Sequence, residues 1–265
     1  MKTYLMCEPR YFEVSYVINP WMAANIGLVN KALAAQQWKN LYNTLSQKAN
    51  IKLVEPVAGL PDMVFTANAG LVSKNREVII SSFRHAERQG ESQHFEKFFA
   101  DAGYYIKYLI LNIIFEGGGD ALFDANGELW FGSGPRSDVA AMAEISGTLH
   151  VKINALTLTD PRWYHLDTAF CPLTEGYVLA YKKAFSAESI ITIQHRFGDK
   201  VIWVSDEDAN NFACNAICMD HDVILHRASK ELKATLKQYN FNVIDVDVSE
   251  FLKSGGSCKC MTLEI

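Results

Sequence analysis

A short strand-like hairpin occurs four times in this chain of 265 residues, and this repeat limits the possible folds more than any other feature. Each copy consists of two short runs of β-forming residues around a polar turn. The second runs begin at Val78, Leu129, Tyr177 and Val223, so the unit returns roughly every 45 to 50 residues. Such a period is typical of propeller-like and solenoid folds, in which each unit packs against its neighbours.

A helix and one further strand are predicted after the hairpins. Residues 137–145, 186–190 and 229–236 have small or acidic residues at the start and helix formers behind them. The last of these segments also has an amphipathic period. Strand-like runs follow at 201–204 and 243–246. The unit is therefore strand, strand, helix, strand, and the fold class is α/β.

The two ends of the chain are predicted to share one unit. Residues 260–265 form a strand-like run without a hairpin partner, and residues 4–7 form another. Together they complete a fifth unit, and five units closing into a ring leave no exposed sheet edge. We therefore predict one domain over residues 1–265, because no linker or low-complexity run divides the chain.

Two alternatives are less favoured. A doubly wound parallel sheet also alternates strands and helices, but it does not require a hairpin in every unit. The glycine-rich segment 116–120 has an acid at each end and lacks the full spacing of a dinucleotide-binding loop. A nucleotide site is therefore not predicted.

Composition excludes several classes of protein. With 49% apolar residues and a net charge of −5, the chain can bury a large core and shows no bias toward nucleic acid. No apolar run is long enough to span a bilayer, and residues 1–10 turn polar before any signal-like segment develops. We expect a cytoplasmic protein with no nucleic-acid or membrane partner, and the sequence is compatible with a homo-oligomer.

The six cysteines do not predict a metal site. In a reducing compartment most of them are expected to be buried free thiols. Cys214 and Cys218 lack a second ligand pair, and Cys258 and Cys260 are too close for easy tetrahedral chelation with their neighbours. We predict no metal and no cofactor.

Polar or reactive residues share one phase of the repeat. Just before the first strand of each unit stand Asn68, Asp120, Asp167, Asn215 and, in the last unit, Cys260. Equivalent positions in a ring face a common axis, so these side chains are expected to converge. Each alone has an ordinary explanation as a turn residue or a buried thiol. Their shared phase favours a functional site.

Four motifs in this order resemble the guanidino-group-modifying amidinotransferase superfamily. They are residues 61–68 (PDMVFTAN), 115–120 (FEGGGD), 165–168 (HLDT) and 259–262 (KCMT). This superfamily includes arginine deiminases, dimethylarginine dimethylaminohydrolases and arginine dihydrolases, and the resemblance covers essentially the whole chain. It implies the fivefold pseudosymmetric α/β-propeller called the pentein fold, in agreement with the repeat.

The resemblance also implies the catalytic residues. Cys260 corresponds to the nucleophile, His165 to the general acid and base, and Glu116 to the carboxylate beside them. Cys258 is not the expected nucleophile, because the family places the reactive cysteine directly before the Met-Thr pair.

The substrate contacts are likewise implied by the resemblance. Asp120 and Asp167 stand where the family holds acids that grip the substrate, while Arg88 and Arg136 resemble the binders of its α-carboxylate. Arg84 is an alternative to Arg88. Apart from the resemblance, Asn19, which lies beside residues 20–22 (PWM), is a hypothesis for a loop that closes over the substrate. The full set of expected substrate-binding residues is Asn19, Asp62, Phe65, Asn68, Arg88, Asp120, Arg136 and Asp167.

These residue types suit a small-molecule guanidino substrate, either arginine or a methylated arginine. A guanidinium is a planar cation that carboxylates bind through paired hydrogen bonds. A thiolate can attack its central carbon, and an imidazole can protonate the departing amine and then activate water. The expected enzyme is a hydrolase of C–N bonds in linear amidines.

Asn68 selects among the activities of the superfamily. Deiminases and dimethylarginine hydrolases usually carry an aspartate there, whereas a neutral amide suits a neutral ureido group. This favours an arginine dihydrolase, which converts arginine to ornithine, ammonia and carbon dioxide. The main alternative is a dimethylarginine dimethylaminohydrolase, followed by a deiminase or an amidinotransferase; Asn68 is then only a turn residue. A non-catalytic protein that binds basic ligands is the alternative of a different class.

Overall fold

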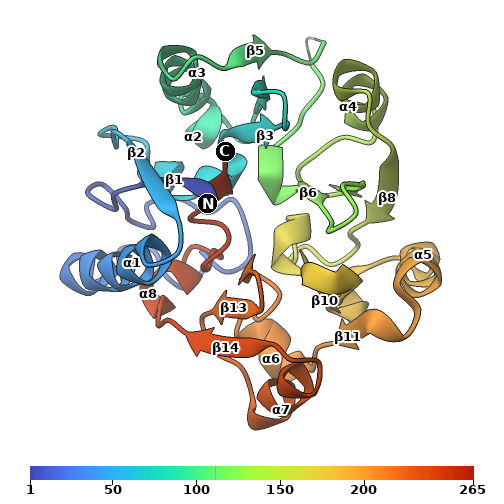
Figure 1. The fold of residues 1–265 in the computed structure, drawn as a ribbon. Helices are drawn as coiled ribbons and strands as arrows, with labels where there is room; N and C mark the ends of the chain where they lie inside the picture. Colours follow the sequence, from blue (N-terminus) through green and yellow to red (C-terminus); the bar gives the residue numbers. More distant parts are fainter. Residues whose placement is uncertain (111) are drawn as a thin grey trace.

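Five three-stranded sheets make up this chain, in a computed structural model that describes residues 1–110 and 112–265. Figure 1 shows the sheets arranged around a common centre, with helices α1, α3, α4, α5 and α7 at the periphery. The predicted mixed α/β class with five units of sheet is confirmed.

The bounds of the elements follow the chain through the five units. The strands are β1 (Thr3–Cys7), β2 (Asn50–Val54), β3 (Gly70–Val72), β4 (Glu77–Ile80), β5 (Tyr105–Lys107), β6 (Ala121–Phe123), β7 (Leu129–Ser133), β8 (Ile153–Thr157), β9 (Phe170–Pro172), β10 (Val178–Ala180), β11 (Val201–Trp203), β12 (Ile217–Met219), β13 (Asp222–Leu225), β14 (Asn242–Asp245) and β15 (Leu263–Glu264). The α-helices are α1 (Lys31–Ser46), α2 (Ala86–Gln89), α3 (Ser92–Asp101), α4 (Ala141–Leu149), α5 (Ala187–Phe197), α6 (Asp206–Asn210), α7 (Lys230–Gln238) and α8 (Ser249–Leu252).

Every sheet has the same internal topology. The first strand of a unit runs antiparallel to the second, and the third strand runs parallel to the second, as in β6-β7-β8. A parallel pair needs a crossover connection, and a helix supplies it in each unit. The predicted strand, strand, helix, strand unit is therefore confirmed.

The fifth unit joins the two ends of the chain, as predicted. β1 pairs antiparallel with β15, with Tyr4 opposite Glu264, and parallel with β2. Figure 1 marks both termini near the centre of the ring. The prediction of a strand over all of residues 260–265 is wrong, because β15 contains only Leu263 and Glu264. The backbone N–H of Cys260 instead donates to the side chain of Asn215, 3.0 Å away, and cannot join a ladder.

Two helix starts agree with the sequence, and one differs. The hydroxyls of Ser186 and Ser229 accept hydrogen bonds from the first turns of α5 and α7, as N-cap residues do. Helix α4 begins at Ala141 and not at residue 137. Ser137 and Asp138 are used elsewhere, since their side chains accept the backbone N–H groups of Glu116 and Ile114.

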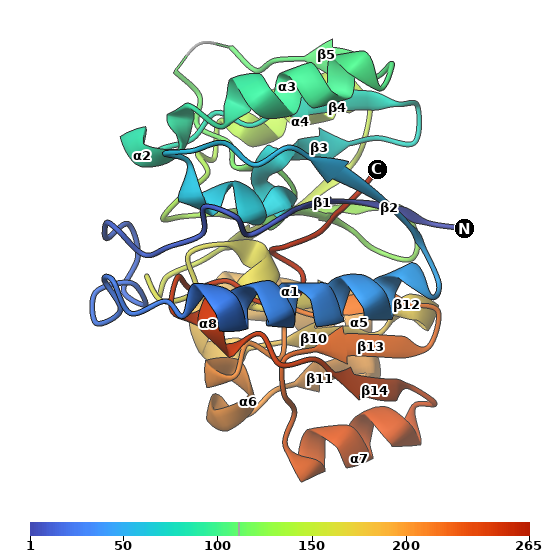
Figure 2. The ribbon, with the colours of Figure 1, turned by 90° about the vertical axis from the view of Figure 1, so that its left-hand side faces the viewer.

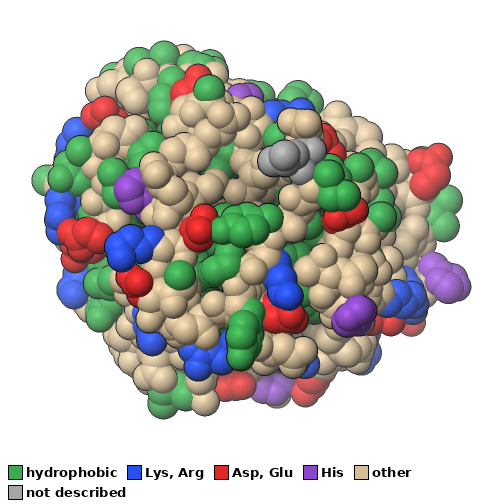
Figure 3. All heavy atoms as spheres, turned by 90° about the horizontal axis from the view of Figure 1, so that it is seen from above, with side chains coloured by type: hydrophobic (Ala, Val, Ile, Leu, Met, Phe, Trp, Pro, Cys, Tyr) green, Lys and Arg blue, Asp and Glu red, His purple; other side chains and the backbone are tan. Residues whose placement is uncertain are grey.

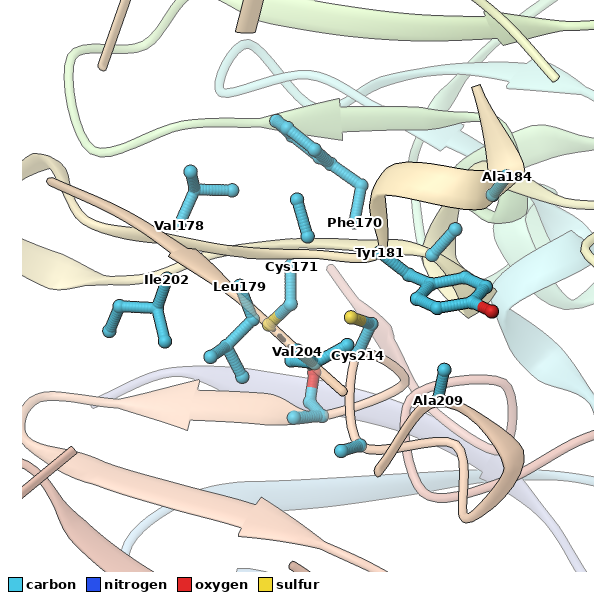
Figure 4. Packing of buried hydrophobic residues seen from close by; sticks show 14 of the residues in the cluster. Phe170, Cys171, Val178, Leu179, Tyr181, Ala184, Ile202, Val204, Ala209 and Cys214 are labelled. Carbon is cyan, nitrogen blue, oxygen red and sulfur yellow. Dashed lines mark hydrogen bonds between the residues drawn. The ribbon is translucent and has the colours of Figure 1, made fainter. Parts of the chain in front are cut away.

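The cysteines outside the centre of the ring lie in apolar surroundings. Figure 4 shows Cys171 and Cys214 packed among apolar side chains such as Leu179 and Val204. All six cysteines are free thiols, and five of them are buried. Burial raises the pKa of both Cys171 and Cys214, which keeps them protonated and unreactive. The expectation that most of the cysteines are buried free thiols is confirmed, and Cys218 is partly exposed.

The surface carries both signs of charge. Figure 3 shows acidic and basic side chains interspersed over the face that it displays. Among the residues described, no helix has the length and apolar character needed to cross a membrane.

A tight turn precedes the first strand in three of the units. These turns are short 3₁₀ helices, η2 (Thr66–Ala69), η3 (Gly117–Gly119) and η4 (Leu166–Thr168). Gly117 has a φ of +63°, and a β-carbon there would lie 2.7 Å from Ser81 Oγ and 2.9 Å from the backbone of Gly70. Only glycine permits this approach, so Gly117 brings η3 against the neighbouring unit.

The variant Gly117→Ala is expected to lose about 3 kcal/mol or more of unfolding free energy, because it adds steric overlap to an unfavourable φ. Gly127→Ala is the matched control. Its φ is +78°, but a β-carbon there meets only Lys74 Nζ, at 3.7 Å. Its expected loss is about 1 to 2 kcal/mol. Urea unfolding measures both variants, and equal losses would show that close approach at Gly117 contributes nothing.

Candidate active site

Hydrogen bonds join the turn before the first strand of each unit to the corresponding turn of the next unit. The side-chain amide of Asn68 donates to the backbone oxygen of Glu116 (2.9 Å). In the following units, the backbone N–H of Leu166 donates to Asp120 Oδ1 (3.0 Å), and the amide of Asn215 donates to the backbone oxygen of Asp167 (3.0 Å).

The circle closes at the nucleophile predicted from sequence. The backbone N–H of Cys260 donates to Asn215 Oδ1 (3.0 Å), and the backbone N–H of Ala67, beside Asn68, donates to the oxygen of Cys260 (3.0 Å). We call these five contacts the central hydrogen-bond ring. The structure thus brings together the polar residues that share one phase of the repeat.

A small cavity opens beside the central hydrogen-bond ring. Figure 2 shows the segment between β1 and α1, in dark blue, projecting on the same side of the ring as α2. Both segments contribute to the cavity wall. Its lining residues are Ile18, Asn19, Met22, Asp62, Phe65, Asn68, Arg88, Arg136, Tyr164, His165, Ser254 and Cys260.

Glu116 holds the imidazole and one arginine together. Its Oε2 lies 2.7 Å from His165 Nε2 and 2.8 Å from Arg136 Nη1. Burial by itself raises the pKa of Glu116, but the charge of Arg136 and the hydrogen bond to His165 outweigh it and hold the pKa well below its usual range. The carboxylate is therefore ionised, and it fixes the orientation of the His165 ring.

His165 is prepared to accept a proton. Burial lowers its pKa to about 4, against the opposing effect of the Glu116 carboxylate. The imidazole is therefore neutral in the resting protein at neutral pH, which is the form that a general base requires.

Cys260 lies between a carboxyl group and an amide. Its Sγ is 3.5 Å from Asp167 Oδ2 and 3.1 Å from the Nδ2 of Asn215. Burial and the adjacent Asp167 raise the pKa of the thiol well above its usual value. Burial also raises the pKa of Asp167, to about 7. The resting thiol is protonated.

Cys258 is not on the cavity wall. It is completely buried in an apolar cluster with Met6 and Phe251, and burial raises its pKa to about 12. Of the two cysteines near the C-terminal end, only Cys260 reaches the cavity.

Arg88 is buried and already paired. It forms two bonds with Glu91, Nε to Oε1 at 2.9 Å and Nη2 to Oε2 at 2.8 Å. Its Nη1 donates to Asn68 Oδ1 at 3.0 Å, and its Nη2 donates to the backbone oxygen of Asp62 at 3.3 Å. Arg84, the alternative suggested by the sequence, instead binds Asp138 at the surface.

Three of the predicted site residues lie behind the wall. Glu116, Asp120 and Asp167 contact lining side chains but are not themselves lining. Asp120 accepts hydrogen bonds from Ser137 Oγ (2.6 Å) and from the N–H of Leu166, so both of its oxygens are occupied. In this structure Asp120 therefore supports the region around His165 and does not face the cavity.

Several wall residues escaped the reasoning from sequence. Tyr164 donates its hydroxyl hydrogen to the oxygen of Gly255 (2.7 Å), and its ring lies over the Arg136 guanidinium. Asn19, which was expected from the sequence, does line the cavity, and it binds the backbone oxygen of Ser254, so it ties the loop after β1 to the C-terminal segment. Tyr164 adjoins a motif histidine, but no spacing in the sequence marks Ser254, Ile18 or Met22.

A larger hollow of about 530 Å³ lies elsewhere, at the turns β6–β7 and β9–β10. Its lining includes Asp124, Glu175, Arg196 and Lys200, but no cysteine or histidine. Without a thiol nucleophile or an imidazole base it cannot attack a guanidinium carbon, so the smaller cavity is the candidate site. Within the described part of the chain, no group of three or more His, Cys, Asp or Glu side chains could hold a metal ion.

The sequence is similar to a family of known proteins. The family profile described as "N,N dimethylarginine dimethylhydrolase, eukaryotic" matches residues 17–265. The N(G),N(G)-dimethylarginine dimethylaminohydrolase of Mycobacterium tuberculosis is 38% identical over 265 residues, which are 100% of this chain and 86% of that protein.

A cyanobacterial enzyme is more similar still. The bifunctional arginine dihydrolase/ornithine cyclodeaminase ArgZ of Synechocystis sp. is 45% identical over 263 residues. The match covers 98% of this chain but only 37% of that longer protein. The crystal structure of its N-terminal domain, a cysteine-to-serine mutant bound to substrate, superposes with a TM-score of 0.98. At 44% identity the two cover 100% and 98% of each other, and that domain is described as an arginine dihydrolase.

The buried Arg88–Glu91 pair generates a stability prediction. Arg88→Met leaves the Glu91 carboxyl buried without its partner, and the expected loss is about 3 to 5 kcal/mol of unfolding free energy. The double variant Arg88→Met/Glu91→Met is expected to be more stable than the single one. Urea unfolding of Arg84→Met, whose ion pair is partly exposed, serves as the control, with a loss of about 1 kcal/mol or less. A double variant less stable than Arg88→Met would contradict this account.

Proposed function

Because this chain belongs to the N,N-dimethylarginine dimethylhydrolase family, we propose that it is a cysteine-dependent hydrolase of the guanidino group, and specifically an arginine dihydrolase. One observation carries the choice of activity: a neutral amide, Asn68, stands on the cavity wall beside Cys260 and His165. The similarity to cyanobacterial arginine dihydrolases supports it.

The fold proposed for this activity is the fivefold pseudosymmetric propeller of the pentein proteins, acting as one catalytic domain over residues 1–265. Five sheets of identical topology support it, as does the pairing of β1 with β15. The six free thiols favour a reducing compartment, the cytoplasm. The proposed partner is a small guanidino molecule.

The first chemical step is attack by the thiolate of Cys260 on the central guanidinium carbon. His165 takes the thiol proton and delivers it to the departing amino group, so that ammonia leaves and a covalent thiouronium forms. The cationic substrate lowers the cost of an anionic sulfur in a buried site that also contains Asp167. Ionised Glu116 stabilises the protonated His165, 2.7 Å away.

Water completes the first round. Neutral His165 removes a proton from water, the hydroxide adds to the thiouronium carbon, and collapse releases citrulline and the sulfur of Cys260. A second round on the ureido carbon releases another ammonia and leaves a thiocarbamate. Its hydrolysis gives a carbamate that loses carbon dioxide and forms ornithine.

Asn68 is proposed to permit the second round. Its amide is neutral and stays in place through bonds to the Glu116 backbone and to Arg88. A ureido group carries no charge, so an amide wall solvates it without an unpaired buried carboxylate.

Dimethylarginine hydrolysis is the second candidate, because the mycobacterial relative of that name matches 100% of this chain. The same thiol, imidazole and carboxylate would act, but methylamines leave instead of ammonia.

Incubation with arginine is expected to yield ornithine and two equivalents of ammonia, measured by amino-acid chromatography and an ammonia assay. Citrulline as the sole product would reject dihydrolysis, and turnover of dimethylarginine alone would support the second candidate.

Cys260→Ser is expected to abolish turnover while arginine still binds. Cys258→Ser is its matched control and is expected to keep activity, since Cys258 is outside the cavity.

Asn68→Asp is expected to shift the products of arginine toward citrulline, with citrulline hydrolysis slowed at least tenfold relative to the first step. The added carboxylate disfavours a neutral ureido group and faces the Glu116 carbonyl, to which Asn68 now donates. The two rates are measured with arginine and with citrulline as separate substrates. Equal slowing of both steps would indicate a general structural effect and contradict the selective role.

A further inference from the structure

Both polar atoms of the Asn215 side chain form hydrogen bonds with Cys260. It is completely buried, and its Nδ2 donates to Cys260 Sγ at 3.1 Å and to the backbone oxygen of Asp167 at 3.0 Å. Its Oδ1 accepts the backbone N–H of Cys260 at 3.0 Å. These partners fix the orientation of the amide, because a flipped group would place N–H against N–H and oxygen against oxygen.

We propose that Asn215 is a positioning residue that holds Cys260 Sγ toward the cavity and stabilises its thiolate through the Nδ2 hydrogen bond. The inference rests on the proposed function, in which Cys260 attacks the substrate. An N–H donor gains strength when its sulfur acceptor becomes anionic. Such a donor therefore favours the thiolate over the thiol.

Asp120 shows that the oxygen of the Asn215 side chain is enough for the link between units and that the N–H group is not needed for it. Asp120 Oδ1 accepts the N–H of Leu166 as Asn215 Oδ1 accepts the N–H of Cys260, one unit linking to the next in both cases. A carboxylate therefore suffices for the link in the central hydrogen-bond ring. The donor group that an amide adds at position 215 points at the sulfur and at the backbone of Asp167.

The charges around the sulfur make such a donor useful. Asp167, from η4, opposes an anionic sulfur, and the ring of Tyr164 offers no positive charge. The cations are Lys259, the residue before Cys260, the cavity-wall arginines Arg88 and Arg136, and His165 once it is protonated. Asn215 is the side-chain N–H donor that contacts the sulfur among the described residues.

The test measures how fast iodoacetamide alkylates Cys260 as a function of pH, with mass spectrometry of the peptide that contains it. Asn215→Asp keeps the size and the acceptor but loses both donors. The midpoint of alkylation is expected to rise by at least about one pH unit, which is about a tenfold slower reaction at a fixed pH below the midpoint. With arginine, kcat is expected to fall at least tenfold and KM to change little.

Two controls accompany this variant. Cys218, a partly exposed thiol of the same protein, is the internal reference and is expected to keep its alkylation profile. Asn242→Ala removes an amide of the same unit that binds Asp222, away from the cavity, and is expected to leave the Cys260 midpoint and kcat unchanged.

A purely structural Asn215 predicts that a folded Asn215→Ala protein keeps the Cys260 midpoint. Asn215→Asp raises the midpoint through its added charge as well as through the lost donor, so an unchanged midpoint in Asn215→Asp overturns the proposal and Asn215→Ala separates the two effects. Asn215→Ala removes the donor without adding charge, so it tests the midpoint even where Asn215→Asp fails to fold. An unchanged midpoint in a folded Asn215→Ala protein also overturns the proposal.

Iodoacetamide needs no arginine, so the two proposals fail separately. A raised Cys260 midpoint without any arginine hydrolysis supports the role of Asn215 and rejects dihydrolysis. Ornithine formation together with unchanged Cys260 midpoints in both Asn215 variants supports dihydrolysis and rejects the role of Asn215.

Discussion

The central hydrogen-bond ring is the constraint on which the site depends. Each of its five contacts joins a side chain or backbone group of one unit to the next unit, and the last contact joins Cys260 to Ala67. The groups are buried, so leaving any of them unpaired costs about 1 to 3 kcal/mol. The same contacts that fix the register of the five units therefore set the positions of Cys260 and His165, the proposed nucleophile and base.

Buried charges around the cavity occur in pairs, and the pairing sets the protonation states. Glu116 is ionised between Arg136 and His165, while Arg88 is neutralised by Glu91. The imidazole is then neutral and the thiol protonated, so the resting site holds no free thiolate. Under the proposed function, a cationic substrate supplies the positive charge that an anionic sulfur requires. The proposal therefore ties the reactivity of Cys260 to occupancy of the cavity.

The sequence predicted the features that repeat along the chain. It did not predict the contacts between residues that lie far apart in the sequence. The hairpins and the phase of Asn68 and Cys260 are local patterns, and the structure has them. Ser254 gains meaning only from Asn19, which folding brings to it from the other end of the chain. The same cause explains the short β15, where a bond to Asn215 replaces a strand ladder. The period of the repeat does not indicate which backbone groups bind side chains that are distant in the sequence.

Asn68 shows how fold and specificity depend on the same atoms. Its Nδ2 is used by the Glu116 carbonyl and its Oδ1 by Arg88, so an amide fits both partners without a buried unpaired charge. A carboxylate would satisfy Arg88 better and the carbonyl not at all. The carbonyl belongs to Glu116, whose carboxylate orients His165. One neutral side chain on the cavity wall is therefore linked both to Arg88 and to the residue that holds the imidazole.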